Sequence, residues 1–96
     1  MPTVQNVQRQ IRRIEGFTVQ FVYEGPGPRA GRDVRDDRGG IPGYGYERAA
    51  ADKITVANWV DVRFKRCFSG FDVRVLDGSG RAVNGHTKLG TLRATY

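Results

Sequence analysis

The chain has 96 residues, of which 39% are hydrophobic and 27% charged, and it carries a formal net charge of +6. This composition is typical of one folded domain spanning residues 1–96 and excludes a fully disordered chain. No apolar run approaches the ~20 residues of a membrane-spanning helix, and residues 1–6 lack the pattern of a secretory signal. The single cysteine cannot form an internal disulfide, so we expect a cytoplasmic protein with no membrane partner.

The first predicted element is a helix. Hydrophobic residues recur at spacings of three and four from Val4 to Ile14, which is the period of one helix face. Thr3 stands where an N-cap is expected, and Gly16 follows as a stop signal. The pattern therefore predicts a helix that begins after Thr3 and ends before Gly16.

A strand and a long loop follow this helix. The segment from Phe17 to Tyr23 alternates in polarity, which predicts a strand with one buried face. A loop rich in Gly, Pro and Arg then runs from Glu24 to about Arg48, with a short strand near 32–35 that could pair with the first. A loop of this length is expected to be functional or mobile. If it is mobile, only about seventy residues build the core, which makes a homodimer plausible.

The segment 56–67 fits two structures. Its hydrophobic residues fit a helix face capped by Thr55, but alternation over residues 60–65 fits a strand equally well. We favour the helix, on which Arg63 would lie inside the apolar stripe. An arginine in that position needs a carboxylate partner or an aliphatic stem that reaches water.

A weak internal repeat supports the helix. In both halves of the chain a Thr-Val pair opens a helix-like segment, which leads through Gly16-Phe17 or Gly70-Phe71 into an alternating strand. Turn signals at 77–80 and 84–85 then separate short predicted strands at 81–83 and 89–95. We therefore predict an α+β fold in which two helices pack on one face of a small antiparallel sheet. This αββαββ arrangement is a ferredoxin-like layout with its first strand moved to the end.

Catalytic and metal-binding patterns are weak. His86 and Cys67 could in principle form a nucleophilic pair, but Cys67 falls on the predicted apolar face. The acidic residues of segment 33–37 alternate with arginines, which indicates compensated charge and not a metal site. We expect no enzyme, no metal and no cofactor.

The basic residues are unevenly distributed. The 24–48 loop holds five acidic and five basic residues, so the net charge lies on the first helix and the C-terminal third. A basic stripe on a sheet would suit a phosphate backbone, although a net charge of this size also serves solubility. The leading hypothesis is a non-catalytic nucleic-acid-binding module, with Arg9, Arg13, Arg74, Arg81 and Arg93 as its binding residues.

The alternative hypothesis is a protein-interaction module that uses the 24–48 loop. Tyr and Arg are the residues that interface hot spots favour, and this loop offers Arg38, Tyr44, Tyr46 and Arg48. Its partner would be an acidic protein surface, and the protein an inhibitor or adaptor, as is common among accessory proteins of bacteria, phages and mobile elements. The tyrosines could instead fold back and cap the core.

Overall fold

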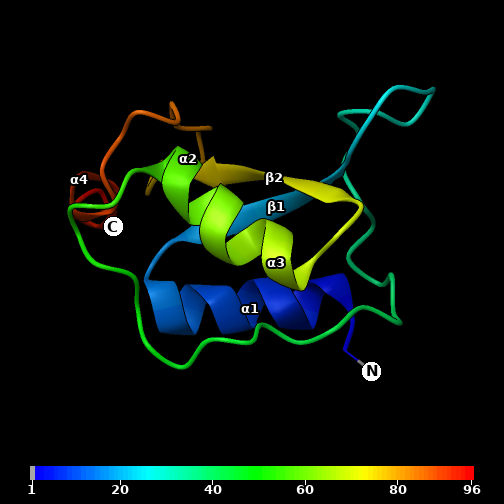
Figure 1. Ribbon diagram of the computed structural model, residues 1–96, viewed down its shortest axis with the longest axis horizontal. Helices are drawn as coiled ribbons and strands as arrows, with labels where there is room; N and C mark the ends of the chain where they lie inside the picture. The colour runs from blue at the N-terminus through cyan, green and yellow to red at the C-terminus, as the bar shows by residue number, and fades with distance from the viewer. Residues whose placement is uncertain (1) are drawn as a thin grey trace.

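The computed structural model describes residues 2–96, so Met1 of the expected domain lies outside the described residues. Its elements are α1 (Val4–Glu15), β1 (Thr18–Tyr23), α2 (Val56–Trp59), the π-helical turn η1 (Val60–Phe64), α3 (Lys65–Cys67), β2 (Phe71–Leu76) and α4 (Leu89–Arg93). Helices packed with a small antiparallel sheet confirm the predicted α+β class (Figure 1). Within residues 2–96, no helix is long and apolar enough to cross a membrane.

Helix α1 has the ends that the sequence predicts. The Thr3 hydroxyl accepts a hydrogen bond from the backbone N–H of Asn6, 3.3 Å away, and so satisfies one of the free donors of the first turn. Gly16 ends the helix in the left-handed conformation, with φ of 87°, and its N–H bonds to the carbonyl of Arg12. A residue with a side chain is strained at that φ, which explains why glycine stands there.

The sheet consists of β1 and β2, paired antiparallel. Phe21 lies opposite Val73 in the register, and both are on the face that meets the helices. The Phe21 ring packs edge-on against Phe64 and Phe68, with centroids 4.9 and 5.0 Å apart. Since α1 contributes to the same hydrophobic cluster, both helical segments pack on one face, as predicted.

Residues 56–67 form one continuous helical segment with a π-turn in its middle. The N–H of Lys65 bonds to the carbonyl of Val60, five residues earlier. This wider turn places Trp59 and Phe64, also five residues apart, on the same buried side. Val62 is 49% exposed, so the alternation over residues 60–65 that also fitted a strand does not reflect one buried face.

The internal repeat is present in reduced form. Each helical segment leads into a strand, but the predicted strands at 32–35 and 81–83 shrink to isolated bridges. Asp33 pairs with Val22 at one edge of the sheet, and Ala82 pairs with Leu76 at the other. The predicted four-stranded sheet is therefore reduced to two strands, each with one isolated bridge at its outer edge. Because β1 and β2 pair directly with each other, the strand order is not that of the permuted ferredoxin-like layout.

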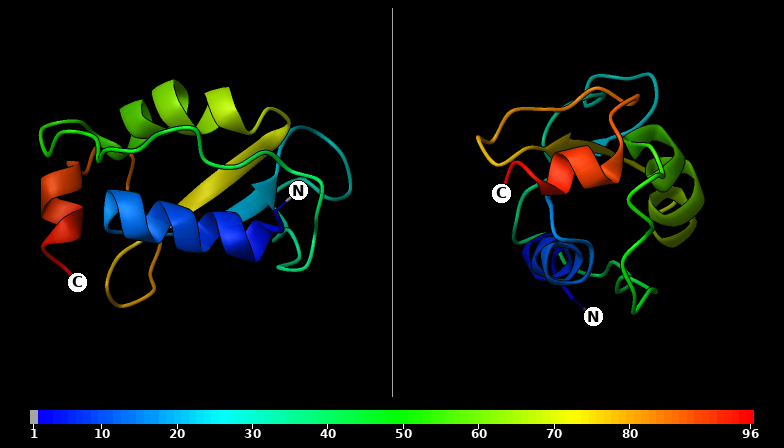
Figure 2. Two further views of the ribbon diagram at one scale, coloured as in Figure 1. Left: turned by 90° about the horizontal axis from the view of Figure 1, so that it is seen from below. Right: turned by 90° about the vertical axis from the view of Figure 1, so that its left-hand side faces the viewer.

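The predicted strand at 89–95 is wrong, because this segment contains helix α4. Leu89 and Leu92, three residues apart, are both fully buried. A strand would turn residues at odd spacing to opposite faces, whereas one helical turn brings them to the same side. Figure 2 shows α4 beside the C-terminal end of α1.

The second half of the predicted loop is part of the core. Residues 34–50, here called the strap, run along α1 from its N-terminal to its C-terminal end (Figures 1 and 2). The N–H of Val4 bonds to the Arg38 carbonyl at 2.8 Å, and the N–H of Tyr44 bonds to Oε1 of Gln10 at 3.0 Å. Four strap residues are buried in the hydrophobic cluster: Val34, Ile41, Tyr44 and Ala50. The strap thus contributes to the core, which removes the reason given above for expecting a homodimer.

Candidate nucleic-acid interface

A buried ionic cluster holds several of the predicted site residues. Glu15 is 1% exposed, at the end of α1. Its carboxylate accepts hydrogen bonds from Arg63 at 2.6 Å, Arg93 at 3.0 Å, the Tyr44 hydroxyl at 2.6 Å and the N–H of Ala50 at 2.9 Å. Two guanidinium groups and two neutral donors therefore compensate one buried carboxylate, as a charge in the interior requires.

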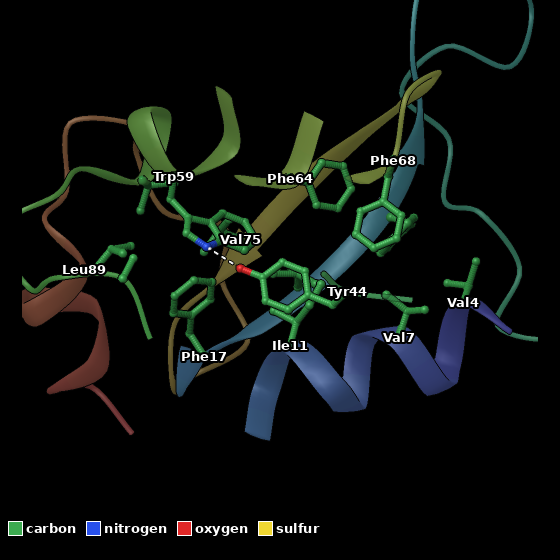
Figure 3. Close-up of a cluster of buried hydrophobic side chains, with 14 of the residues drawn as sticks. Val4, Val7, Ile11, Phe17, Tyr44, Trp59, Phe64, Phe68, Val75 and Leu89 are labelled. Carbon is green, nitrogen blue, oxygen red and sulfur yellow. Dashed lines mark hydrogen bonds between the residues drawn. The ribbon is translucent and has the colours of Figure 1, made fainter. Parts of the chain in front are cut away.

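The cluster keeps Tyr44 neutral and Arg63 charged. Burial and the neighbouring Glu15 raise the pKa of Tyr44 well above its usual value. The Tyr44 hydroxyl also accepts a hydrogen bond from the Trp59 indole N–H at 3.1 Å (Figure 3). Burial alone would lower the pKa of Arg63, but its contacts with Tyr44 and Glu15 outweigh that effect and raise it.

Arg93 belongs to this cluster and not to a basic stripe. Its side chain is 18% exposed, and it also donates to the Glu15 carbonyl at 2.6 Å and the Ala50 carbonyl at 2.7 Å. A further bond of 2.7 Å reaches Asp52. Arg93 stands on α4, where all its guanidinium nitrogens are engaged within the protein, so we leave it out of the candidate interface.

The loop tyrosines also turn inward. Tyr44 is 4% exposed, and Tyr46 lies under the Arg63 guanidinium, 4.4 Å from its ring centroid. The carbonyl of Arg48 accepts a hydrogen bond from Arg63 at 2.5 Å. Arg38 lies over the ring of Phe71 at 5.2 Å. These contacts match the interpretation in which the tyrosines cap the core. Their rings pack within the protein, so they are not free to contact a partner of the 24–48 loop.

Arg74 lies on β2 and Arg81 follows that strand in the chain, but the two arginines differ in environment. Arg74 is on the outward face of β2 and forms an ion pair with Asp33. Arg81 is exposed, and its guanidinium makes no hydrogen bond or ion pair with any of residues 2–96. One arginine is neutralised, so the strands do not present the continuous basic stripe that we expected.

The exposed side of α1 carries the remaining predicted residues. Arg9 and Arg13, together with Arg12, are exposed and form no ion pair within the described part of the chain. They line a groove of about 500 Å³. Its other lining residues are Gln5, Gln8, Gly16, Thr18 and Asp36. Three guanidinium groups thus face one carboxylate in this groove, which makes it basic.

Two residues of the groove are oriented by contacts outside it. Oε1 of Gln8 accepts a hydrogen bond from the N–H of Phe21 at 3.0 Å, which leaves the Gln8 NH₂ as a donor. The guanidinium of Arg12 lies over the ring of Tyr96, 4.7 Å from its centroid. The groove therefore combines positive charge with an oriented amide donor, and the Tyr96 ring adjoins it through Arg12.

Arg9 and Arg13 are among the predicted site residues, whereas Arg12 and Tyr96 are not. Arg12 is one of the basic residues of the helix, and its spacing of three from Arg9 places both on neighbouring positions of one helix surface. Tyr96 lies far from α1 in the sequence, and no local pattern connects the two.

Residues 2–96 show neither a hydrogen-bonded Cys–His pair nor a cluster of metal ligands. Neither the Cys67 thiol nor the His86 ring forms a hydrogen bond there, and no group of three or more His, Cys, Asp or Glu side chains could hold a metal ion. No protein family, curated protein or solved structure matches the chain.

Proposed function

We propose that the protein is a nucleic-acid-binding module that contacts the phosphate backbone through the α1 groove. The observation that carries this proposal is the set of three exposed arginines, Arg9, Arg12 and Arg13, without a carboxylate partner among residues 2–96. A guanidinium presents a planar fork of donors that matches the oxygens of a phosphate. All three arginines line the same groove, so their donors could contact one ligand together.

The arginines have a second, structural role. Arg12 and Arg13 lie in the last turn of α1, where positive charge stabilises the helix dipole. That interaction is made through charge at a distance and leaves the N–H groups available to a ligand. It does not explain Arg9, which lies earlier in the helix, nor the hollow beside all three.

A nucleic-acid ligand also agrees with the cytoplasmic location that we expect for a chain with one free cysteine. The alternative, protein binding through residues 24–48, has less support. Tyr44 and Tyr46 make their contacts within the protein, and Arg38 lies on Phe71.

Replacing the three groove arginines tests the proposal. We expect R9Q/R12Q/R13Q to lose most of its affinity for a labelled oligonucleotide in fluorescence anisotropy, because Gln keeps helix propensity but removes the charge. Three arginine charges close to the backbone of the strand predict that the wild-type affinity for a single strand falls about 20-fold between about 50 and 200 mM salt. The variant should show a much shallower dependence.

A matched control removes the same charge elsewhere. Arg29, Arg32 and Arg66 are exposed and lie outside the groove, so R29Q/R32Q/R66Q should bind nearly as well as the wild type. Equal losses in the two triple variants, or no binding by the wild type at low salt, would contradict the proposal.

A further inference from the structure

An aromatic ring lies at the edge of the arginine groove. Tyr96 is 42% exposed, and the flat guanidinium of Arg12 covers part of its ring. Arg12 and Thr18 both line the groove and both contact Tyr96. The contact between the Arg12 guanidinium and the Tyr96 ring thus adjoins the groove that Arg9 and Arg13 also line.

The backbone fixes the position of this ring. The Tyr96 hydroxyl accepts a hydrogen bond from the N–H of Thr18 at 2.8 Å and donates to the carbonyl of Leu76. Thr18 and Leu76 are opposite each other in the β1–β2 register, so the hydroxyl is inserted between the ends of the two strands. The ring is therefore oriented before any ligand arrives, which lowers the entropy that binding must remove.

The turn after β2 packs against the same C-terminal residues. A Cβ added at Gly78 would lie 1.9 Å from the carbonyl oxygen of Thr95, a distance that no side chain tolerates. The Gly78 N–H also bonds to the Thr95 hydroxyl at 2.8 Å. Glycine at this position thus allows the turn to hold the residue next to Tyr96 in place.

We propose that the groove binds single-stranded nucleic acid, with an unstacked base on the Arg12–Tyr96 pair and phosphates at Arg9 and Arg13. This inference rests on the proposed function and specifies its ligand. Every base has a flat face, and aromatic rings and guanidinium planes are the surfaces on which single strands stack their bases. A duplex keeps its bases paired and stacked inside, so it gains nothing from such a pair.

The groove also offers partners for the edge of a base. The Gln8 amide can donate, and the Asp36 carboxylate can accept from the amino group of a base. Asp36 would repel a phosphate, which directs the backbone of the strand away from it and toward the arginines. The charge distribution therefore gives the strand a preferred placement, with bases and phosphates on different parts of the groove.

The affinities of the protein for three ligands distinguish base stacking from binding of the phosphate backbone alone. The ligands are an oligonucleotide of about ten nucleotides, an abasic strand of the same length, and the corresponding duplex. We expect the wild type to bind the base-bearing strand about ten-fold more tightly than the abasic strand in fluorescence anisotropy. A ribose version alongside the deoxyribose strand shows which of the two nucleic acids is preferred.

Two conservative variants isolate the stacking pair. Arg12→Lys keeps the charge but loses the flat group, so it should reduce the preference for bases and leave the salt dependence unchanged. Tyr96→Phe keeps the ring but loses the two hydrogen bonds that orient it, so it should retain only part of the preference. A base preference unchanged in Arg12→Lys would contradict the inference.

The two proposals fail in different ways. Equal binding of the base-bearing and abasic strands, or tighter binding of the duplex, would overturn single-strand recognition and leave phosphate binding intact. No binding of any of the three ligands at low salt would overturn both.

Discussion

Glu15 illustrates how much of this fold depends on single residues that are distant in the sequence. Its carboxylate is bound by Tyr44, 29 residues away, and by Arg93, 78 residues away. Of the two alternatives that the sequence left open for Arg63, a carboxylate partner or a stem that reaches water, the structure shows the carboxylate partner. The identity of that partner could not be predicted, because Glu15 occupies an ordinary position at the end of a helix and no local pattern connects residues 48 positions apart.

Neutralising Glu15 should destabilise the protein strongly. Glu15→Gln keeps the shape but leaves Arg63 and Arg93 without their shared counter-ion, and breaking a buried ion pair typically costs about 3–5 kcal/mol. We expect the lower end of this range, about 3 kcal/mol, since water can still reach part of both arginines. Urea unfolding monitored by Trp59 fluorescence would measure the loss.

The control for this change is Glu47→Gln, because Glu47 is exposed and forms no ion pair within the described residues. It should alter the free energy of unfolding by less than about 0.5 kcal/mol. A loss in Glu15→Gln as small as that in Glu47→Gln would show that the cluster contributes little to stability.

At the scale of elements, prediction succeeded where the signals were local. Helix α1 shows its period over three turns and has a capping residue at each end, so both its type and its boundaries are confirmed. Strands β1 and β2 were predicted from their alternation. Helix α4 was missed because its five residues are too few to show a period.

The burial of the strap, in contrast, could not be predicted from local signals. Its Gly and Pro content predicts a loop, and it has no regular structure, yet Val34 and Ile41 are 1% and 3% exposed. These residues belong to a hydrophobic cluster whose other members include residues of α1, both strands, the segment 56–68 and α4. A composition signal describes the local backbone and contains no information about distant packing partners.

Truncating a buried strap residue should therefore lower the free energy of unfolding more than truncating a residue of a mobile loop would. Ile41→Ala removes buried methyl and methylene groups, and such core changes typically cost about 2–5 kcal/mol. Val62→Ala is the matched control, since Val62 is 49% exposed and its truncation should be nearly neutral. If denaturant unfolding gives the same midpoint for both variants, the strap is not part of the cooperative core.

At the scale of the whole molecule, the distribution of charge decides where a ligand can bind. The neutrality of the 24–48 loop follows from the sequence alone. The structure then separates the remaining arginines, since Arg93 is engaged inside the protein and Arg74 is paired with Asp33. The helix arginines were foreseen as basic residues, but the groove beside them was not, because it also needs Thr18 and Asp36 from other segments.

The central claim is that a nucleic acid binds at the α1 groove, and mapping the contact surface by NMR tests it most directly. A single-stranded oligonucleotide would be titrated into isotopically labelled protein at about 50 mM salt, while the backbone amide shifts are followed. We predict that the largest changes fall on residues 5–18, near Asp36 and at Tyr96. Changes centred on residues 24–33, or spread evenly over Arg29, Arg66 and Arg81, would contradict the claim.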